Sequence, residues 1–528
     1  MMTKRPRVLV TEHLGDEGLK ALRAEVDVEA YDLLPVDELP KLLPAFDAVI
    51  IRSAHRMTKD LLDLAPQLRV VARAGAGVDN IDLEAATARG VLALNTPGAN
   101  AEAAAEHTFA LLLALVRHVR ISDQHVRAGG WNRQAFIGTE LRGKSLGIIG
   151  IGRVGREVAR IAKGFGMQTY AFDPYVAEET VRARGATKVE TLEQLLHLSE
   201  VLTIHTPKTG PHLSRAELEK LPRGAFVLNV ARGGLIDEDA LQALCEEGHL
   251  AGSALDVFAH EPPSDARLLA RDDMVFTCHL GGSTTEAMSS IGTRIAGAVV
   301  RALRGEIPEE AVNLPFPNVD GVVPAQLLQI GRTLGRIVAA TGGEGPLLCV
   351  ACRGGLPDEV APITARAVLT GILERVVDGP VNPVNAVLRA QEAGLQVSIN
   401  IEAGGPPRLA AWFAGEEERQ VEVTVEHSPR IRRLAGGRFD LRLPRQLLVT
   451  QHKDLPGVVG RVGTLLGSAG INIATLELDR EIAGGHALMA LGLDDPVDET
   501  LLYSLRQLPE MQHIYTVGIA VVEEGARQ

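Results

Sequence analysis

Short apolar segments alternate with polar or helix-forming segments in the N-terminal part of the chain. The β-rich segments are residues 7–10, 47–51, 68–73 and 90–95. Strands of this length that alternate with helical stretches are typical of a parallel sheet covered by helices. A Thr-Pro-Gly sequence at residues 96–98 interrupts the pattern. We therefore predict an α/β layer that ends near residue 98.

A second series of apolar segments shares one feature, because each segment ends in glycine, proline or a polar residue. These segments are residues 145–152, 169–173, 201–207, 225–234, 253–258 and 275–283. In doubly wound sheets, ligands bind beyond the carboxyl ends of the strands. The residues at these ends are therefore the first candidates for chemistry.

Between the two series, residues 101–128 have the pattern of one long helix, with Asn100 placed to cap it. Its apolar stripe is wide for a surface helix. Two interpretations remain: the stripe packs against another subunit, or it belongs to the core of its own domain. The stripe contains Phe109, Leu112, Leu113 and Val116.

The chain changes character after residues 313–317 (NLPFP), where two prolines exclude a continuous helix and indicate a domain end. Residues 320–443 contain a helical run at 325–340, a strand-like alternation at 420–427 and glycine-rich turns. From Arg445 onwards the pattern is β-α-β-β-α-β, the order of a ferredoxin-like split unit.

Length and composition narrow the function. A chain of 528 residues, at roughly 150 residues per domain, indicates three or four domains. A net charge of −13 argues against a nucleic-acid partner or an anionic membrane. No signal peptide and no apolar run long enough to span a membrane is visible, so we expect a cytoplasmic protein without a membrane partner.

The four cysteines are too few and too scattered for a disulfide framework. Cys349 and Cys352 form a C-x-x-C pair, which occurs in redox and zinc sites. No second pair completes a metal site, and the surrounding sequence is typical of an apolar strand. We favour the strand and expect no metal.

The sharpest local signal is a G-x-G-x-x-G motif formed by Gly150, Gly152 and Gly155. It follows an apolar strand and begins a helix, the context in which such a turn binds a pyrophosphate. Asp173 ends the next strand, where a carboxylate accepts hydrogen bonds from an adenosine ribose and repels a 2′-phosphate. The motif predicts NAD as the cofactor; the alternative is a glycine turn with a capping aspartate.

A nicotinamide cofactor implies hydride transfer, and an alcohol that loses hydride needs a base for its hydroxyl proton. Polar residues that follow the later strands are Arg232, Glu261 and His279. Histidine suits the base, a carboxylate can orient it, and arginine can hold a substrate carboxylate. Taken singly, each is better explained without catalysis: Arg232 as a surface charge, Glu261 as a turn residue and His279 as a core histidine. Their joint position after the nucleotide motif favours catalysis.

The segment from Gly150 to Ser283 resembles the D-isomer-specific 2-hydroxyacid dehydrogenases. The resemblance implies His279 as acid and base, Glu261 as its partner and Arg232 as the group that binds the substrate carboxylate and carbonyl. Further motifs are similar to the family of D-3-phosphoglycerate dehydrogenases, which oxidise 3-phospho-D-glycerate to 3-phosphohydroxypyruvate at the start of the phosphorylated route to serine. These motifs are residues 52–54, 72–80, 95–97, 105–108 and 138–141.

The resemblance also implies the ligand contacts. It implies that the substrate cleft is lined by Arg52, Ser53, Arg73, Ala74, Gly75 and Asn100, and that Arg133 reaches the substrate phosphate of a neighbouring subunit. The implied NAD contacts, beside the glycines, are Arg153, Val154, Asp173, Thr206, Val230, Ala231, Asp256 and Gly281. Several arginines also suit a substrate that carries both a carboxylate and a phosphate.

The resemblance extends to the architecture. It implies a flavodoxin-like substrate domain (residues 1–98 and 288–316) into which a Rossmann-type NAD domain (99–287) is inserted. An α+β intervening allosteric substrate-binding domain (317–444) and a ferredoxin-like ACT domain (445–528) follow. A homotetramer is expected.

The ACT-like pattern implies a site for the end product L-serine. Its residues are His452, Asp454, Gly457, Val458 and Asn472. The chain departs from many relatives at Asp479-Arg480, where they have Gly-Arg. The alternative is an ACT unit that only dimerises. Arg430, Arg432 and Arg433 form a charge run that is either a second anion site or a solvated face.

Two other functions remain open at the level of the sequence. One is a dehydrogenase for another D-2-hydroxy acid, such as glyoxylate, hydroxypyruvate or D-lactate. The other is a dinucleotide-sensing binding protein similar to corepressors that share this fold.

Overall fold

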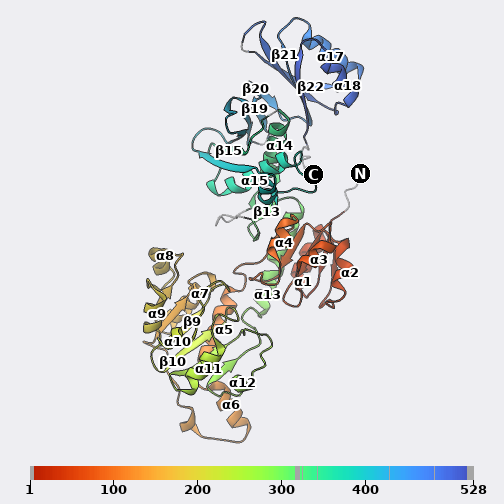
Figure 1. The fold of residues 1–528 in the computed structure, drawn as a ribbon. Helices are drawn as coiled ribbons and strands as arrows, with labels where there is room; N and C mark the ends of the chain where they lie inside the picture. Colours follow the sequence, from red (N-terminus) through yellow and green to blue (C-terminus); the bar gives the residue numbers. More distant parts are fainter. Residues whose placement is uncertain are drawn as a thin grey trace.

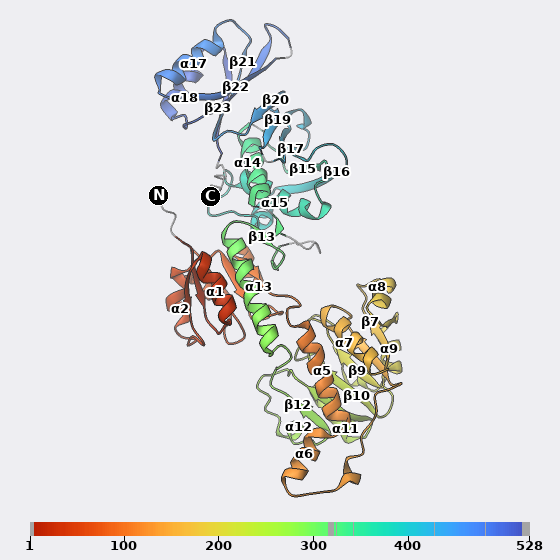
Figure 2. The same cartoon turned by 180° about the vertical axis from the view of Figure 1, so that it is seen from behind.

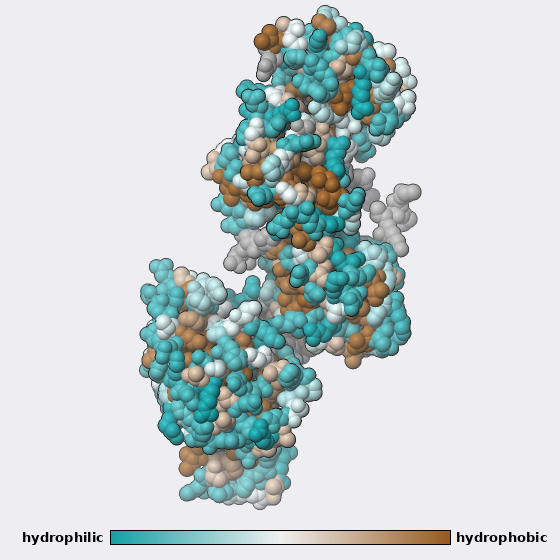
Figure 3. All heavy atoms as spheres, viewed as in Figure 1, coloured by the Kyte–Doolittle hydropathy of each residue, from teal (hydrophilic) through white to brown (hydrophobic). Residues whose placement is uncertain are grey.

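The computed structural model describes residues 5–314, 322–323, 325–341, 343–426, 428–480 and 482–519. Figures 1 and 2 show four units along an elongated molecule, with the inserted second unit at one end and the C-terminal unit at the other. The face of the molecule drawn in Figure 3 is mainly hydrophilic, with apolar side chains in scattered patches. The predicted boundary at residues 316 and 317 lies outside the described residues, and the other boundary positions stay predictions.

The first unit contains a parallel five-stranded sheet with the flavodoxin-like order β2-β1-β3-β4-β5. Its strands are β1 (Arg7–Val10), β2 (Asp27–Ala30), β3 (Ala48–Ile51), β4 (Val70–Arg73) and β5 (Leu92–Leu94). Its helices are α1 (Asp16–Glu25), α2 (Leu39–Leu42), α3 (Lys59–Leu64) and α4 (Leu83–Ala88), with the 3-10 turn η1 (Leu43–Ala45).

Helix α13 (Thr285–Leu303) returns to the first unit after the second unit has been completed. It crosses α1 so closely that a Cβ on Gly18 would lie 2.8 Å from the carbonyl carbon of Gly292. The second unit is therefore inserted into the first. The predicted boundary between residues 287 and 288 falls in the first turn of this helix.

The second unit contains a parallel seven-stranded sheet with the order β12-β11-β10-β9-β6-β7-β8, which includes the doubly wound order of a Rossmann fold. Its strands are β6 (Ser145–Ile149), β7 (Gln168–Phe172), β8 (Thr187–Lys188), β9 (Val201–Ile204), β10 (Ala225–Asn229), β11 (Leu250–Leu255) and β12 (Met274–Phe276). The helices after the glycine motif are α7 (Arg153–Gly164), α8 (Glu178–Ala183), α9 (Leu192–Leu198), α10 (Arg215–Leu218), α11 (Glu238–Glu246) and α12 (Ala266–Leu269).

The prediction of one helix over residues 101–128 is wrong. The chain forms α5 (Ala101–Val116) and α6 (Val119–Arg127), because His118 adopts a left-handed conformation with φ of 56° that breaks the helix. Asn100 is the N-cap residue of α5, but its side chain makes no capping hydrogen bond.

The apolar stripe of α5 packs inside its own unit. Phe109, Leu112 and Val116 are buried, in one cluster with core residues of β6 and α7. This confirms the core interpretation for these side chains. By contrast, no residue of α6 is buried.

The third unit is built on a six-stranded sheet with the order β16-β15-β17-β18-β19-β20. The strands β13 (Ile307–Pro308) and β14 (Val322–Val323) form a separate two-stranded sheet between the first and third units. The elements of the third unit are α14 (Ala325–Thr341), β15 (Leu347–Arg353), η3 (Asp358–Val360), α15 (Ala361–Leu373), α16 (Ala386–Glu392), β16 (Gln396–Glu402), β17 (Arg408–Phe413), η4 (Glu417–Arg419), β18 (Val421–Thr424), β19 (Arg430–Leu434) and β20 (Gly437–Arg442). Cys349 and Cys352 lie within β15, which confirms the strand interpretation, and burial raises the pKa of both thiols.

The fourth unit has the predicted β-α-β-β-α-β order. Its elements are β21 (Gln446–Lys453), α17 (Val458–Ser468), β22 (Ile473–Arg480), β23 (His486–Leu493), α18 (Glu499–Arg506) and β24 (Met511–Gly518). They form an antiparallel sheet with the order β22-β23-β21-β24. Among the described residues, no helix is both long and apolar enough to cross a membrane.

Candidate active site

The turn between β6 and α7 carries the three glycines of the nucleotide motif. Gly150 has a φ of 88°, and a Cβ there would lie 2.8 Å from the carbonyl oxygen of His205. A Cβ on Gly155 would overlap the carbonyl oxygen of Gly150, so α7 packs directly on the turn. A Cβ on Gly152 would meet no described atom within 4 Å. The turn is therefore open where a pyrophosphate needs access to the first N–H groups of α7, which Arg153 and Val154 begin.

Asp173 and Thr206 lie at the carboxyl ends of strands beside this turn. The Asp173 carboxylate accepts the N–H groups of Ile151 at 3.1 Å and of Tyr175 at 3.0 Å. Thr206 has a buried hydroxyl oxygen without a hydrogen-bond partner in the described structure. Because a buried polar group without a partner is costly, this hydroxyl fits a ligand that satisfies it. The open turn, the carboxylate and the hydroxyl together fit a dinucleotide.

Other predicted nucleotide contacts meet at the same edge of the sheet. Val230 and Ala231 follow β10, and Asp256 follows β11. A Cβ on Gly281 would lie 3.0 Å from Val230 Cγ1 and 3.2 Å from Asp256 Oδ2. The sheet therefore brings residues that are distant in sequence to one side of the glycine turn.

His279 and Glu261 form a pair at this edge. Glu261 Oε2 lies 2.9 Å from His279 Nδ1, and its other oxygen accepts the N–H of Phe258 at 3.1 Å. The two side chains are half-exposed and border a cavity of about 620 Å³. An imidazole whose Nδ1 is held by a carboxylate can exchange a proton through the opposite nitrogen, Nε2.

Two arginines from different units converge over Gly77. A Cβ on this glycine would overlap Arg232 Nη2 and lie 2.7 Å from Arg73 Nη1. Burial first, and then the charge of Arg232, lower the pKa of Arg73. Arg232 also pairs with Asp79 at 3.2 Å. Two adjacent cations favour an anion between them.

The chain is similar to known dehydrogenases over nearly its whole length. The model of the D-isomer specific 2-hydroxyacid dehydrogenase, NAD binding domain, matches residues 109–281. The D-3-phosphoglycerate dehydrogenase of Bacillus subtilis is 36% identical over 526 residues, which cover 97% of this chain and 99% of that protein. The enzyme of the same name from Methanocaldococcus jannaschii is 34% identical and is covered over its full length, with 97% of this chain. The chain belongs to the D-3-phosphoglycerate dehydrogenase family.

Solved structures agree with this membership of the wider dehydrogenase family. A Thermus thermophilus protein is 34% identical with a TM-score of 0.54, over 58% of this chain and 99% of that one. A D-lactate dehydrogenase from Aquifex aeolicus, solved with NAD and lactic acid, is 26% identical with a TM-score of 0.51, over 56% of this chain and 96% of that one. This D-3-phosphoglycerate dehydrogenase family member is an oxidoreductase with NAD as its cofactor.

The predicted substrate loop follows β3, and its backbone is held by a residue that the sequence analysis missed. Glu12 accepts the N–H groups of Arg52 at 2.8 Å, Ser53 at 3.3 Å and Ala54 at 3.2 Å. The available signal was an acidic residue just beyond the carboxyl end of β1. Arg52 and Arg73 are linked because Arg73 Nε donates to the Arg52 carbonyl at 3.4 Å.

The other predicted substrate residues divide into two groups in this family member. Ala74 and Gly75 follow β4 directly, and a Cβ on Gly282 would lie 2.6 Å from the Asn100 amide nitrogen, so Asn100 adjoins the histidine loop. Arg133 is exposed and begins η2 (Arg133–Phe136), which follows α6 in the chain. Helix α6 lies at the end of the second unit that is farthest from the first unit (Figure 1). Within one chain, Arg133 does not join the other substrate residues.

Four of the five predicted regulatory residues lie around the start of α17, whereas Asn472 follows the end of this helix. His452 is buried, which lowers its pKa, and Gly457 and Val458 begin the helix. Asp454 accepts the Gly484 N–H at 3.1 Å and pairs with Arg480 at 2.8 Å, and both contacts lower its pKa. Asn472 donates to Asp494 at 2.7 Å.

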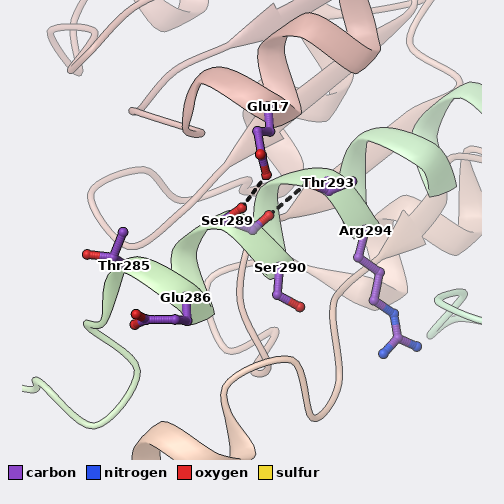
Figure 4. A pocket seen from close by; sticks show the side chains of 7 residues that line it. All are labelled: Glu17, Thr285, Glu286, Ser289, Ser290, Thr293 and Arg294. Carbon is purple, nitrogen blue, oxygen red and sulfur yellow. Dashed lines mark hydrogen bonds between the residues drawn. The ribbon is translucent and has the colours of Figure 1, made fainter.

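A separate groove of about 680 Å³ runs along α13 (Figure 4). Ser289 donates to Glu17 at 2.6 Å, which ties α13 to α1. The groove contains none of the predicted site residues; it is lined by Glu17, Thr285, Glu286, Ser289, Ser290, Thr293 and Arg294.

Proposed function

We propose that His279, Glu261 and Arg232 carry out the oxidation of 3-phospho-D-glycerate to 3-phosphohydroxypyruvate, the first step of the phosphorylated route to L-serine. The observation that carries the proposal is the 2.9 Å contact between His279 Nδ1 and Glu261 Oε2. It lies at the sheet edge shared with the nucleotide turn. The full-length similarity to D-3-phosphoglycerate dehydrogenases supports the choice of substrate.

The reaction needs a base and an anion clamp. His279 Nε2 takes the proton of the C2 hydroxyl, while Glu261 orients the ring and stabilises the imidazolium that forms. Arg232 holds the substrate carboxylate and the developing carbonyl oxygen. The residues that would hold NAD are those of the glycine turn with Asp173, Thr206, Val230, Ala231, Asp256 and Gly281. The bound cofactor would supply the acceptor for the hydride.

The phosphate group of the substrate is bound by basic side chains and by the backbone of the first unit. Arg52, Ser53, Arg73, Ala74 and Gly75 lie in loops after β3 and β4. Arg133 of a second copy completes the site. Exposed apolar residues near Arg133 support this subunit contact, since Trp131 is 81% and Ile137 78% exposed in the single chain. Further contacts between C-terminal units would make a homotetramer in the cytoplasm.

The test compares phosphorylated with unphosphorylated substrates. Replacing the base by His279→Ala should lower kcat by about 10²- to 10⁴-fold with 3-phospho-D-glycerate. Arg52→Ala should raise KM for this substrate and leave turnover of D-lactate unchanged. If the wild type preferred D-lactate or glyoxylate, the alternative of another D-2-hydroxy acid dehydrogenase would hold. Absence of NADH formation with every substrate would favour a binding protein.

We also propose that the C-terminal unit, residues 445–528, is an ACT domain that binds L-serine between two copies, after an intervening domain at residues 317–444. Backbone N–H groups at the start of α17 bind the carboxylate, and either Asp454 or Asn472 binds the ammonium group. Arg480 competes with the ammonium group of L-serine for Asp454, because the Arg480 and Asp454 side chains already form an ion pair at 2.8 Å. Arg480→Gln should therefore strengthen inhibition by L-serine in steady-state assays. Absence of inhibition in both proteins would leave dimerisation as the role of the unit.

A further inference from the structure

The side chain of His107, on α5, contacts the loop that carries His279. Its Nε2 atom lies 3.0 Å from Thr277 Oγ1 and 3.3 Å from Asp256 Oδ1. The His107 side chain is 19% exposed and the Asp256 side chain 1% exposed. α5 thus contacts the loops that follow β11 and β12. His107 belongs to the motif at residues 105–108, for which the proposed reaction has no role.

The positions of the hydrogen atoms follow from the partners. Thr277 has one hydroxyl hydrogen, and its Oγ1 lies 2.6 Å from Asp256 Oδ1, so the hydroxyl donates to the carboxylate. Thr277 can then only accept from His107. His107 Nε2 is therefore protonated and donates to both Thr277 and Asp256.

Asp256 in turn holds three consecutive N–H groups of the catalytic loop. Its carbonyl oxygen accepts from His279 at 2.9 Å. Its carboxylate accepts from Leu280 at 2.7 Å and from Gly281 at 2.8 Å. These contacts fix His279 in a left-handed conformation, with φ of 58°, that a residue with a Cβ rarely adopts.

The network keeps Asp256 ionised. Burial acts to raise its pKa, but hydrogen bonds from His107, Thr277 and the two N–H groups outweigh burial and lower the pKa to about 2. A buried carboxylate depends on its donors, because water cannot replace them. His107 is the donor that comes from outside the two strand-end loops.

We propose that His107 is a positioning residue for the reaction: through its Nε2–H it holds the Asp256 carboxylate, which clamps the backbone of residues 279–281 and so aims the His279 ring. The inference rests on the proposed role of His279 as the base. Loss of the donor leaves Asp256 underpaired and frees the loop. A small displacement of a reacting group can cost about 100-fold in rate.

The first experiment uses two amides that differ in reach. Gln at position 107 can place an N–H near the position of His107 Nε2, and Asn is one methylene shorter. His107→Gln should keep kcat within about threefold of the wild type, while His107→Asn should lower kcat by about 10- to 100-fold with KM for 3-phospho-D-glycerate nearly unchanged. Equal kinetics for the two variants would overturn the proposal.

A matched control tests whether helix packing alone explains the effect. Thr108 is buried on α5, and its hydroxyl donates to the Ala104 carbonyl at 2.8 Å, within the same helix. Thr108→Val should leave kcat unchanged. If it lowered kcat as much as His107→Asn, the role of His107 would be structural only.

The second experiment does not depend on turnover. Hydrogen exchange of the amides of His279, Leu280 and Gly281 should be faster in His107→Asn than in the wild type and in His107→Gln. Unchanged exchange would overturn the clamp even if His279 is the base. Conversely, full activity of His279→Ala would reject the proposed chemistry without changing the exchange result.

Discussion

His205 shows how burial sets a protonation state at the nucleotide site. It follows β9, and its carbonyl oxygen packs against Gly150. Its Nδ1 atom is buried without a partner in the described structure, while Nε2 lies 2.9 Å from Thr203 Oγ1. Burial lowers the pKa of His205 to about 4, so the ring stays neutral near pH 7.

This pKa predicts a pH dependence of stability. The unfolded chain binds a proton at His205 below about pH 6.5, whereas the folded protein binds it only near pH 4. The contribution of His205 to the free energy of unfolding is therefore complete above about pH 6.5. It decreases, by up to about 3 kcal/mol, as the pH falls towards 4. His205→Gln should reduce this decrease when the opening free energy of β9 is measured by hydrogen exchange at pH 7.5 and pH 5.

The control is an exposed histidine. The His13 side chain is 49% exposed, so His13→Gln should keep the wild-type pH dependence. A decrease in His205→Gln as large as in the wild type would contradict the prediction.

At the scale of single residues, the sequence indicated the functional side chains that lie just after the ends of strands. His279 and Glu261 were found in this way, and they form the predicted pair. Glu12 and His107 were missed, because their partners lie elsewhere in the chain: Glu12 binds the loop after β3, and His107 binds Asp256. Such contacts exist only once the sheet and α5 are assembled.

At the scale of elements, α7 and its glycines allow a matched pair of substitutions. A Cβ on Gly155 would overlap the Gly150 carbonyl oxygen, whereas a Cβ on Gly164, at the end of the same helix, would meet no described atom within 4 Å. Gly155→Ala should destabilise the unit by about 1–3 kcal/mol and weaken NAD binding, because the turn must move. Gly164→Ala should be neutral or stabilising by up to about 1 kcal/mol. Thermal unfolding and NAD titration check both, and similar results for the two variants would refute the packing argument.

The limits of sequence patterns are clearest in α5 and α6. The periodicity predicted one helix, since nothing in the sequence forces a break at His118. The break instead leaves α5 in the core and turns α6 into an exposed extension. In contrast, the strand-end pattern predicted the two parallel sheets, because each buried strand is a short apolar segment bounded by turn residues.

At the scale of the whole molecule, the insertion of one unit into another separates residues that act together. Arg73 comes from the first unit and Arg232 from the second, and they meet over Gly77. Sequence patterns alone do not indicate such a meeting, because it depends on how the units are oriented. Arg133 does not join this cluster, because it lies in η2, which follows the exposed helix α6.

The position of Arg133 predicts active sites that are shared between subunits. If one subunit supplies His279 and its neighbour supplies Arg133, His279→Ala and Arg133→Ala are each defective alone but complement each other in a mixed dimer. One of the two sites in the hybrid then contains both native residues. Random mixing in equal amounts should restore about a quarter of the wild-type activity, because about half of the dimers are hybrids with one intact site.

The measurement is 3-phospho-D-glycerate turnover after the two variants are unfolded together and refolded together. Mixing without subunit exchange provides the control and should give only the sum of the separate activities. A second control mixes a double variant, with His279→Ala and Arg133→Ala in one chain, with the His279→Ala variant. This mixture should stay inactive, because no site in it contains His279. If co-refolding of the complementary variants restored no activity, the prediction of a shared active site would be wrong. Arg133 would then act within its own chain or have no role in the reaction.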